Sequence, residues 1–133
     1  MIGILLVTHK ELAEALMNVC DLILGHQEGI QALSLDPQAS PEECRQQIQR
    51  GLGQVNNGNG VIILTDMLGG TPSNLTLSFL KEGKVEVVTG VNLPMLMKLA
   101  QLREERDVVQ VALALKQYGQ KGITVASEVL RHK

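Results

Sequence analysis

Short apolar runs alternate along the chain with segments in which apolar residues recur every three or four positions. The first such segment has the spacing of one helical face, at Leu12, Ala15, Leu16, Val19, Cys20 and Ile23. The uninterrupted runs are typical of strands and lie at residues 2–7, 30–35, 61–65 and 85–89. This alternation predicts an α/β sandwich around a mostly parallel sheet.

Capping residues and prolines mark the later helices. Ser40 is the expected N-cap of a helix that has Pro41 at its first position and Glu43 at its third. Thr71 is the expected N-cap of the next helix. The helices after the first are predicted at residues 41–55, 72–80, 94–102 and 107–119. A short fifth strand is predicted at residues 123–126.

The 133 residues correspond to one domain spanning residues 1–133. We expect a doubly wound sandwich whose sheet has the order 2-1-3-4, with the short fifth strand added. Ligands of such sheets bind beyond the carboxyl ends of the strands, where the strand order reverses. That point lies between the first and third strands, so functional residues are expected in the loops that begin at His9 and Asp66.

His9 and Asp66 are the candidate catalytic residues. Neighbouring strands lie about 4.8 Å apart, so side chains at their ends can meet. A carboxylate that binds one ring nitrogen of a histidine leaves the other free as a nucleophile or base. Two glycines and a helix start follow Asp66, and their backbone N–H groups suit a phosphate. The candidate phosphate-binding residues are Gly69, Gly70, Thr71, Ser73 and Asn74. The combination suggests a phosphoryl group bound to the histidine.

Each feature also has a structural interpretation. His9 taken alone is also consistent with a polar surface residue, Asp66 with a strand-ending turn, and the two glycines with a tight loop. Met95 and Met97 belong to an apolar cluster that suits either core packing or a flexible docking surface. The residues alone leave these alternatives open.

Composition disfavours several classes of protein. Twelve basic and 14 acidic side chains give a net charge of -2, and Phe79 and Tyr118 are the only aromatic residues. Nucleic-acid binding by charge or by stacking is therefore not expected. No apolar stretch approaches the roughly 18 residues that span a bilayer, and the start resembles no signal peptide. We therefore expect a cytoplasmic protein.

No metal site and no other cofactor is expected. Cys20 and Cys44 form no C-x-x-C pair and lack the spacing of zinc ligands, and Cys20 is expected in the core. His9 and His26 are separated by a helix of roughly 25 Å, so they cannot share a metal ion. His132 lies close to the end of the sequence.

Three sequence blocks together resemble one family. They are residues 4–13 (ILLVTHKELA), 65–74 (TDMLGGTPSN) and 89–96 (TGVNLPML). In their order they are similar to the enzyme IIA (EIIA) domain of the mannose class of the bacterial phosphoenolpyruvate-dependent sugar phosphotransferase system (PTS). The similarity covers nearly the whole chain.

The resemblance implies a phosphotransferase that carries a phosphoryl group on His9. The group would come from the histidine-containing phosphocarrier protein (HPr) and pass to a separate IIB protein during sugar uptake. Asp66 would orient the histidine, and residues 69–74 would lie beside the phosphate. The resemblance also implies a homodimer, often with an exchanged last strand, and contact with the membrane only through the IIC/IID permease.

Two other functions remain to be compared with this one. In a regulatory PTS module, phosphorylation of His9 would control a partner protein without sugar transport, and the same residues would be required. A receiver domain phosphorylated on aspartate would need acidic residues after the first strand that hold magnesium. Residues 7–9 (VTH) supply none. The sugar and the identity of the IIB protein are not indicated.

Overall fold

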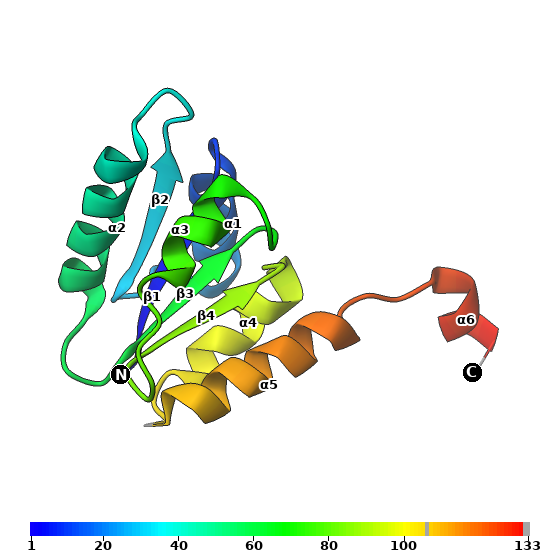
Figure 1. Cartoon of the computed structure of the whole chain (residues 1–133). Helices are drawn as coiled ribbons and strands as arrows, with labels where there is room; N and C mark the ends of the chain where they lie inside the picture. The colour runs from blue at the N-terminus through cyan, green and yellow to red at the C-terminus, as the bar shows by residue number, and fades with distance from the viewer. Residues whose placement is uncertain (106, 132–133) are drawn as a thin grey trace.

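The computed structural model describes residues 1–105 and 107–131, and its centre is a sheet of four parallel strands in the order β2-β1-β3-β4 (Figure 1). The strands are β1 (Gly3–His9), β2 (Ile30–Leu35), β3 (Val61–Thr65) and β4 (Val85–Thr89). The predicted fold class and strand order are therefore confirmed.

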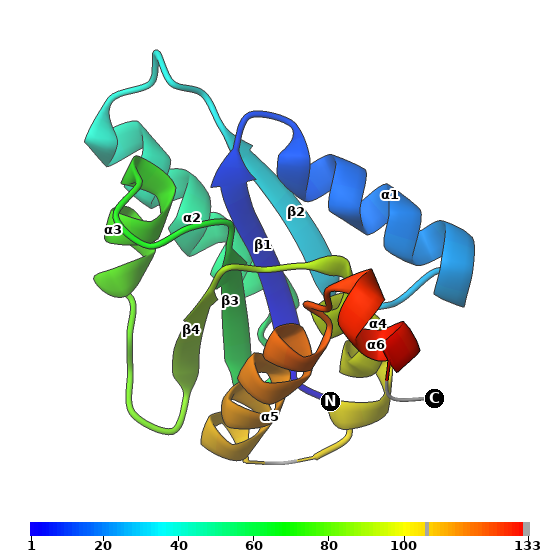
Figure 2. The same ribbon diagram turned by 90° about the vertical axis from the view of Figure 1, so that its right-hand side faces the viewer.

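Helices cover both faces of this sheet (Figures 1 and 2). One face carries α1 (Leu12–Leu24), α4 (Leu93–Leu102) and α5 (Val108–Lys121). The other face carries α2 (Pro41–Val55) and α3 (Thr71–Leu77). The predicted helices agree with these bounds to within a few residues.

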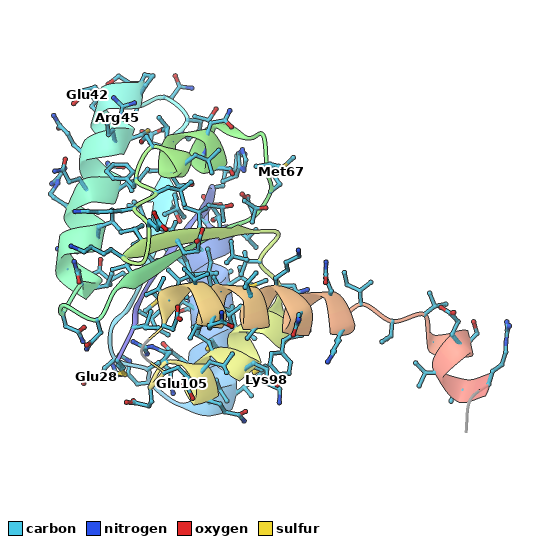
Figure 3. The ribbon with its side chains drawn as sticks, turned by 60° about the horizontal axis from the view of Figure 1, so that its bottom comes forward. Glu28, Glu42, Arg45, Met67, Lys98 and Glu105 are labelled. Atoms are coloured by element: carbon cyan, nitrogen blue, oxygen red, sulfur yellow. The ribbon has the colours of Figure 1, made fainter. Side chains whose placement is uncertain are left out.

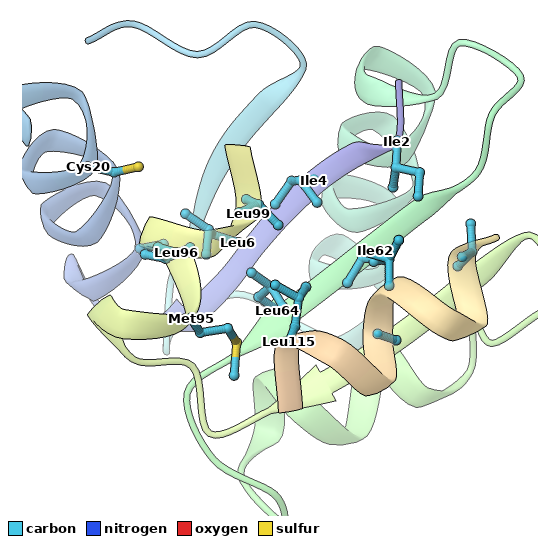
Figure 4. Close-up of a cluster of buried hydrophobic side chains, with 14 residues drawn as sticks. Ile2, Ile4, Leu6, Cys20, Ile62, Leu64, Met95, Leu96, Leu99 and Leu115 are labelled. Carbon is cyan, nitrogen blue, oxygen red and sulfur yellow. The ribbon is translucent and has the colours of Figure 1, made fainter. Parts of the chain in front are cut away.

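The core consists of two clusters, one on each side of the sheet. Successive residues of β1 point to opposite faces of the sheet. Leu6 packs with α4 and α5 (Figure 4), whereas Leu5 and Val7 pack with α2 on the other face. Burial on both faces explains why the strand runs are uninterrupted in the sequence. Cys20 belongs to the first cluster, as predicted. Met95 is buried in the same cluster and Met97 packs against it, so core packing is the alternative that applies to these methionines.

The buried face of α1 differs from the predicted one. The residues that pack against the core are Ala13, Leu16, Met17 and Cys20, whereas Leu12, Val19 and Ile23 are exposed. Apolar residues lie on more than one side of this helix, so their spacing predicts the helix without selecting the face that is buried. Here the buried hydroxyl of Thr8 accepts a hydrogen bond from the Ala13 N–H at 2.7 Å, which orients the first turn of α1.

Of the two predicted helix N-caps, one is confirmed and the other is wrong. At the start of α2, the Ser40 hydroxyl accepts from the Glu43 N–H at 3.1 Å and completes a capping box, as predicted. At the start of α3 the N-cap is Gly70, so the prediction for Thr71 is wrong. Gly70 is extended and its carbonyl accepts from the Asn74 N–H at 2.9 Å, so the first helical hydrogen bond begins one residue earlier.

The C-terminal segment leaves the body of the molecule (Figures 1 and 3). Residues 123–125 form no strand within the chain, and the helix α6 (Ala126–Arg131) follows them with none of its residues buried. A strand needs a neighbour for its N–H and C=O groups, and α5 directs this segment away from the sheet. The short fifth strand is therefore not formed within a single chain. His132 lies outside the described residues, and no described helix is long and apolar enough to cross a membrane.

Candidate functional site

The candidate site lies at the carboxyl ends of β1 and β3. These strands pair in parallel with Val7 opposite Thr65, so the residues that follow each strand emerge side by side. The Nδ1 atom of His9 lies 2.8 Å from Oδ2 of Asp66. The structure therefore brings together two residues that are 57 positions apart in the sequence.

Asp66 is held on both of its oxygens. Its Oδ2 also accepts the backbone N–H of His9 at 3.1 Å, and its Oδ1 accepts the backbone N–H of Met67 at 3.0 Å. Burial by itself would raise the pKa of the carboxyl, but the hydrogen bonds from the His9 ring and backbone outweigh it and lower the pKa. Asp66 is therefore a carboxylate at neutral pH and cannot rotate without losing these bonds.

The second ring nitrogen of His9 is available for chemistry. The His9 side chain is 48% exposed, and Nε2 has no hydrogen-bond partner among the residues that the structure describes. Gly70 lies against the ring, where a Cβ atom would come within 2.5 Å of Cε1 and 3.0 Å of Nε2. The absence of a side chain at Gly70 therefore keeps the space beside Nε2 open.

The residues that follow Asp66 differ in how exposed they are. Gly69 has a φ of 93°, which favours glycine. Met67 is exposed at the start of the loop (Figure 3). Ser73 is fully buried, and its hydroxyl has no hydrogen-bond partner in the described chain. Asn74 is exposed, and its Nδ2 lies 3.5 Å from the Gly69 carbonyl.

A cavity of about 270 Å³ adjoins the histidine. Its walls come from the ends of β1 and β2 and the starts of α2 and α3, and they are largely apolar. The lining residues are His9, Lys10, Leu35, Asp36, Pro37, Ala39, Pro41, Cys44, Thr71 and Pro72. Of the five residues predicted to bind phosphate, only Thr71 lines this cavity.

Lys10 is the site residue that the sequence reasoning missed. It follows His9 directly, lines the same cavity, and has a φ of 45°. The sequence offered one indication of such a role, the position of Lys10 next to the candidate histidine. Most lysines lie at the surface without a specific function, so that indication is weak.

The arrangement suits a nucleophilic histidine rather than a nucleophilic cysteine. Cys44 is buried in the cavity wall, and burial together with Glu43 and Asp36 raises the pKa of its thiol. A neutral imidazole whose Nδ1–H is held by a carboxylate directs its Nε2 lone pair outward. No serine, cysteine or metal ion is needed for such a group to attack phosphorus.

Known proteins share this architecture. Residues 3–115 match the family described as "PTS system fructose IIA component". The chain is 28% identical over 131 residues to the "PTS system fructose-specific EIIA component" of Bacillus subtilis, covering 98% of this chain and 90% of that protein. It is 30% identical over 125 residues to the "PTS system mannose-specific EIIAB component" of Escherichia coli K12, covering 92% of this chain and 38% of that protein.

Similarity of structure agrees with similarity of sequence. The crystal structure of "phosphotransferase system component EIIA" from Streptococcus agalactiae superposes with a TM-score of 0.87 at 28% identity, covering 96% of this chain and 99% of that one. The family match runs from β1 into α5 and so contains both strand ends and the loop between β3 and α3. This chain therefore belongs to the mannose class of EIIA components of the sugar phosphotransferase system, which are phosphoryl carriers.

Proposed function

We propose that His9 carries the phosphoryl group on Nε2, accepting it from HPr and passing it to a separate IIB protein during sugar uptake. The observation that supports this proposal is the 2.8 Å contact between His9 Nδ1 and Asp66 Oδ2, combined with a half-exposed ring whose Nε2 is free among the described residues. The protein would act as a phosphotransferase in the cytoplasm and meet the membrane only through the IIC/IID permease.

The transfer needs no proton to leave the site. Nε2 of His9 attacks phosphorus, and the N–P bond to the donor histidine breaks as the new N–P bond forms. The donor nitrogen keeps the electron pair of the broken bond. The His9 ring gains positive charge, which the Asp66 carboxylate stabilises through the Nδ1 proton. Onward transfer to IIB is the same exchange with His9 as the donor.

The loop at residues 69–74 would lie beside the phosphoryl group. Gly70 supports this assignment, because the space that its missing side chain leaves is next to Nε2. The Ser73 hydroxyl, which has no hydrogen-bond partner among the described residues, has unused hydrogen-bonding capacity in the same loop. Gly69, Gly70, Thr71, Ser73 and Asn74 therefore remain the proposed phosphate-binding residues.

Labelling with phosphate tests the proposal. Incubation with phosphoenolpyruvate, the general phosphotransfer enzyme and HPr should add one phosphate that is labile in acid and stable in base. A phosphate lost to base or hydroxylamine would instead be an acyl phosphate on Asp66. His9→Ala should abolish the label, whereas His26→Ala is the matched control and should keep it. Unchanged labelling of His9→Ala would reject His9 as the acceptor.

A further inference from the structure

Lys10 has a backbone conformation that lysine does not favour. With a φ of 45° it is the one non-glycine residue at positive φ among residues 1–105 and 107–131, whereas seven glycines adopt such angles elsewhere. A side chain in this left-handed region crowds its own backbone, and glycine avoids that cost. The turn from β1 into α1 would therefore form more easily with glycine at position 10.

The position of Lys10 offers a reason for a side chain there. Lys10 lines the 270 Å³ cavity beside His9 and is the one basic residue of the cavity wall apart from His9 itself. Strained residues that persist in folded proteins concentrate at functional sites, where the surrounding structure holds them.

Apart from Lys10, the charged residues that contact the His9 ring or line the cavity are acidic. Asp66 contacts the ring directly, and Asp36 lines the cavity. A phosphoryl group brings up to two further negative charges at neutral pH. Without Lys10, these charged groups would all repel the phosphoryl group.

Resting on the function proposed above, we propose that Lys10 is a phosphoryl-binding residue, whose ammonium group faces the phosphate on His9 Nε2 and offsets the surrounding carboxylates. Lysine binds phosphate as a point charge on a flexible stem, so it can follow the group as the partner proteins arrive and leave. Lys10 thereby supplies a cationic contact that the pair of His9 and Asp66 lacks.

Three substitutions separate charge from backbone conformation. Lys10→Met keeps the length of the side chain and the strained backbone but removes the charge. Lys10→Gly removes the charge and relieves the strain, and Lys10→Arg keeps the charge. A role in the turn alone predicts that Lys10→Gly is harmless or beneficial. The proposed role predicts that Met and Gly are equally impaired and that Arg is active.

The first measurement is the rate of phosphorylation by phosphorylated HPr. A unit charge about 4 Å from the phosphoryl group changes this rate by on the order of tenfold, so we expect that loss in Lys10→Met and Lys10→Gly and near wild-type rates in Lys10→Arg. Thermal unfolding should show Lys10→Gly to be more stable than wild type by about 2–6 °C, which rules out misfolding as the cause of its slower reaction.

The second measurement concerns the phosphorylated protein without its partners. The ³¹P chemical shift of phosphorylated His9, followed from pH 6 to 9, reports the pKa of the phosphoryl group. Removing a nearby positive charge should raise this pKa by about 0.5 in Lys10→Met and leave it unchanged in Lys10→Arg. An identical titration in wild type and Lys10→Met would overturn the role of Lys10 while leaving His9 as the carrier. Failure of wild-type His9 to accept phosphate would overturn both proposals.

Discussion

Asp66 determines which nitrogen of His9 can react. Its carboxylate accepts from Nδ1 and so keeps the proton there, whereas an amide in the same place can donate to the ring and favour the other tautomer. The same oxygen also accepts the His9 backbone N–H, so the side chain ties the ends of β1 and β3 together. One residue thereby serves both the chemistry and the geometry of the site.

Asp66→Asn should slow phosphorylation of His9 and onward transfer by on the order of 10- to 1000-fold, the usual contribution of a positioned proton-handling group. The fold should remain intact, because asparagine keeps an acceptor oxygen for one of the two backbone N–H groups, and the hydrogen bond that is lost lies at an exposed strand end rather than in the core. Stopped-flow transfer rates and circular dichroism check these expectations. Rates within about twofold of wild type would make Asp66 a structural turn residue only.

Gly70→Ala should impair the site without disturbing the fold. Gly70 has φ -79° and ψ 163°, which alanine adopts freely, so the added Cβ acts only through its contact with the His9 ring. We expect the phosphorylation rate to fall at least tenfold, since misplacement by about 1 Å can cost 100-fold.

Gly53→Ala is the matched control for this substitution. A Cβ at position 53 in α2 would meet nothing within 4 Å, so alanine there should raise stability by about 0.5–1 kcal/mol and leave the rate unchanged. A wild-type rate for Gly70→Ala would show that the ring moves aside without loss.

At the scale of elements, a buried arginine joins α4 to β1. Arg103 is 2% exposed, and its Nε donates to the Ile2 carbonyl at 3.0 Å, while its own carbonyl accepts the Ile2 N–H at 2.9 Å. Burial lowers the pKa of its guanidinium although Glu104 acts in the opposite direction. The arginine therefore contributes mainly through the packing of its aliphatic stem and this link to the chain start.

Arg103→Ala should destabilise the protein by about 2–4 kcal/mol, because it removes the buried stem and leaves the Ile2 carbonyl without its side-chain donor. Arg103→Met keeps most of the stem and should cost clearly less. Arg45→Ala is the surface control, since its pair with Glu42 is exposed and 3.7 Å long, and it should change stability by less than about 0.5 kcal/mol. Urea unfolding measures all three, and equal effects of Ala and Met at position 103 would contradict the packing argument.

At the scale of the whole molecule, the C-terminal segment and the free edge of β4 are complementary. Among the described strands β4 pairs with β3 alone, apart from an isolated bridge between Lys81 and Val85, and a groove of about 470 Å³ runs between β4 and α5. Residues 123–125 (ITV) are suited to a strand, yet Ile123 and Val125 are 75% and 58% exposed. An unpaired edge and an unpaired apolar segment both favour association.

We therefore expect a homodimer in which residues 123–125 of each chain pair with β4 of the other. Light scattering at micromolar concentration should give twice the 14.4 kDa mass of the chain. Removal of residues 123–133 should yield monomers, whereas Leu22→Ser, at a position on α1 that is 84% exposed, should leave the dimer intact. A wild-type mass near 14.4 kDa would reject the dimer, and a truncated dimer would reject the exchange.

Much of this architecture could be predicted because it depends on local signals. Ser40 and Pro41 start α2 through their own side chains, and the apolar runs of β1 and β3 are buried wherever the sheet forms. The predictions that were wrong concern which of several neighbouring residues takes a given role. The N-cap of α3 is Gly70 and not Thr71, because the first helical hydrogen bond goes to the Gly70 carbonyl and Thr71 already has a helical conformation.

The sequence by itself determined the order of elements, the parallel sheet and the two strand ends where His9 and Asp66 stand, because periodicity and strand connection are properties of the chain. Only the tertiary structure decided that these side chains meet at 2.8 Å, which face of α1 is buried, that Lys10 shares the cavity, and that a cation, Arg103, lies in the core. Most of these features depend on contacts between segments far apart in the sequence, which form only when the whole chain packs.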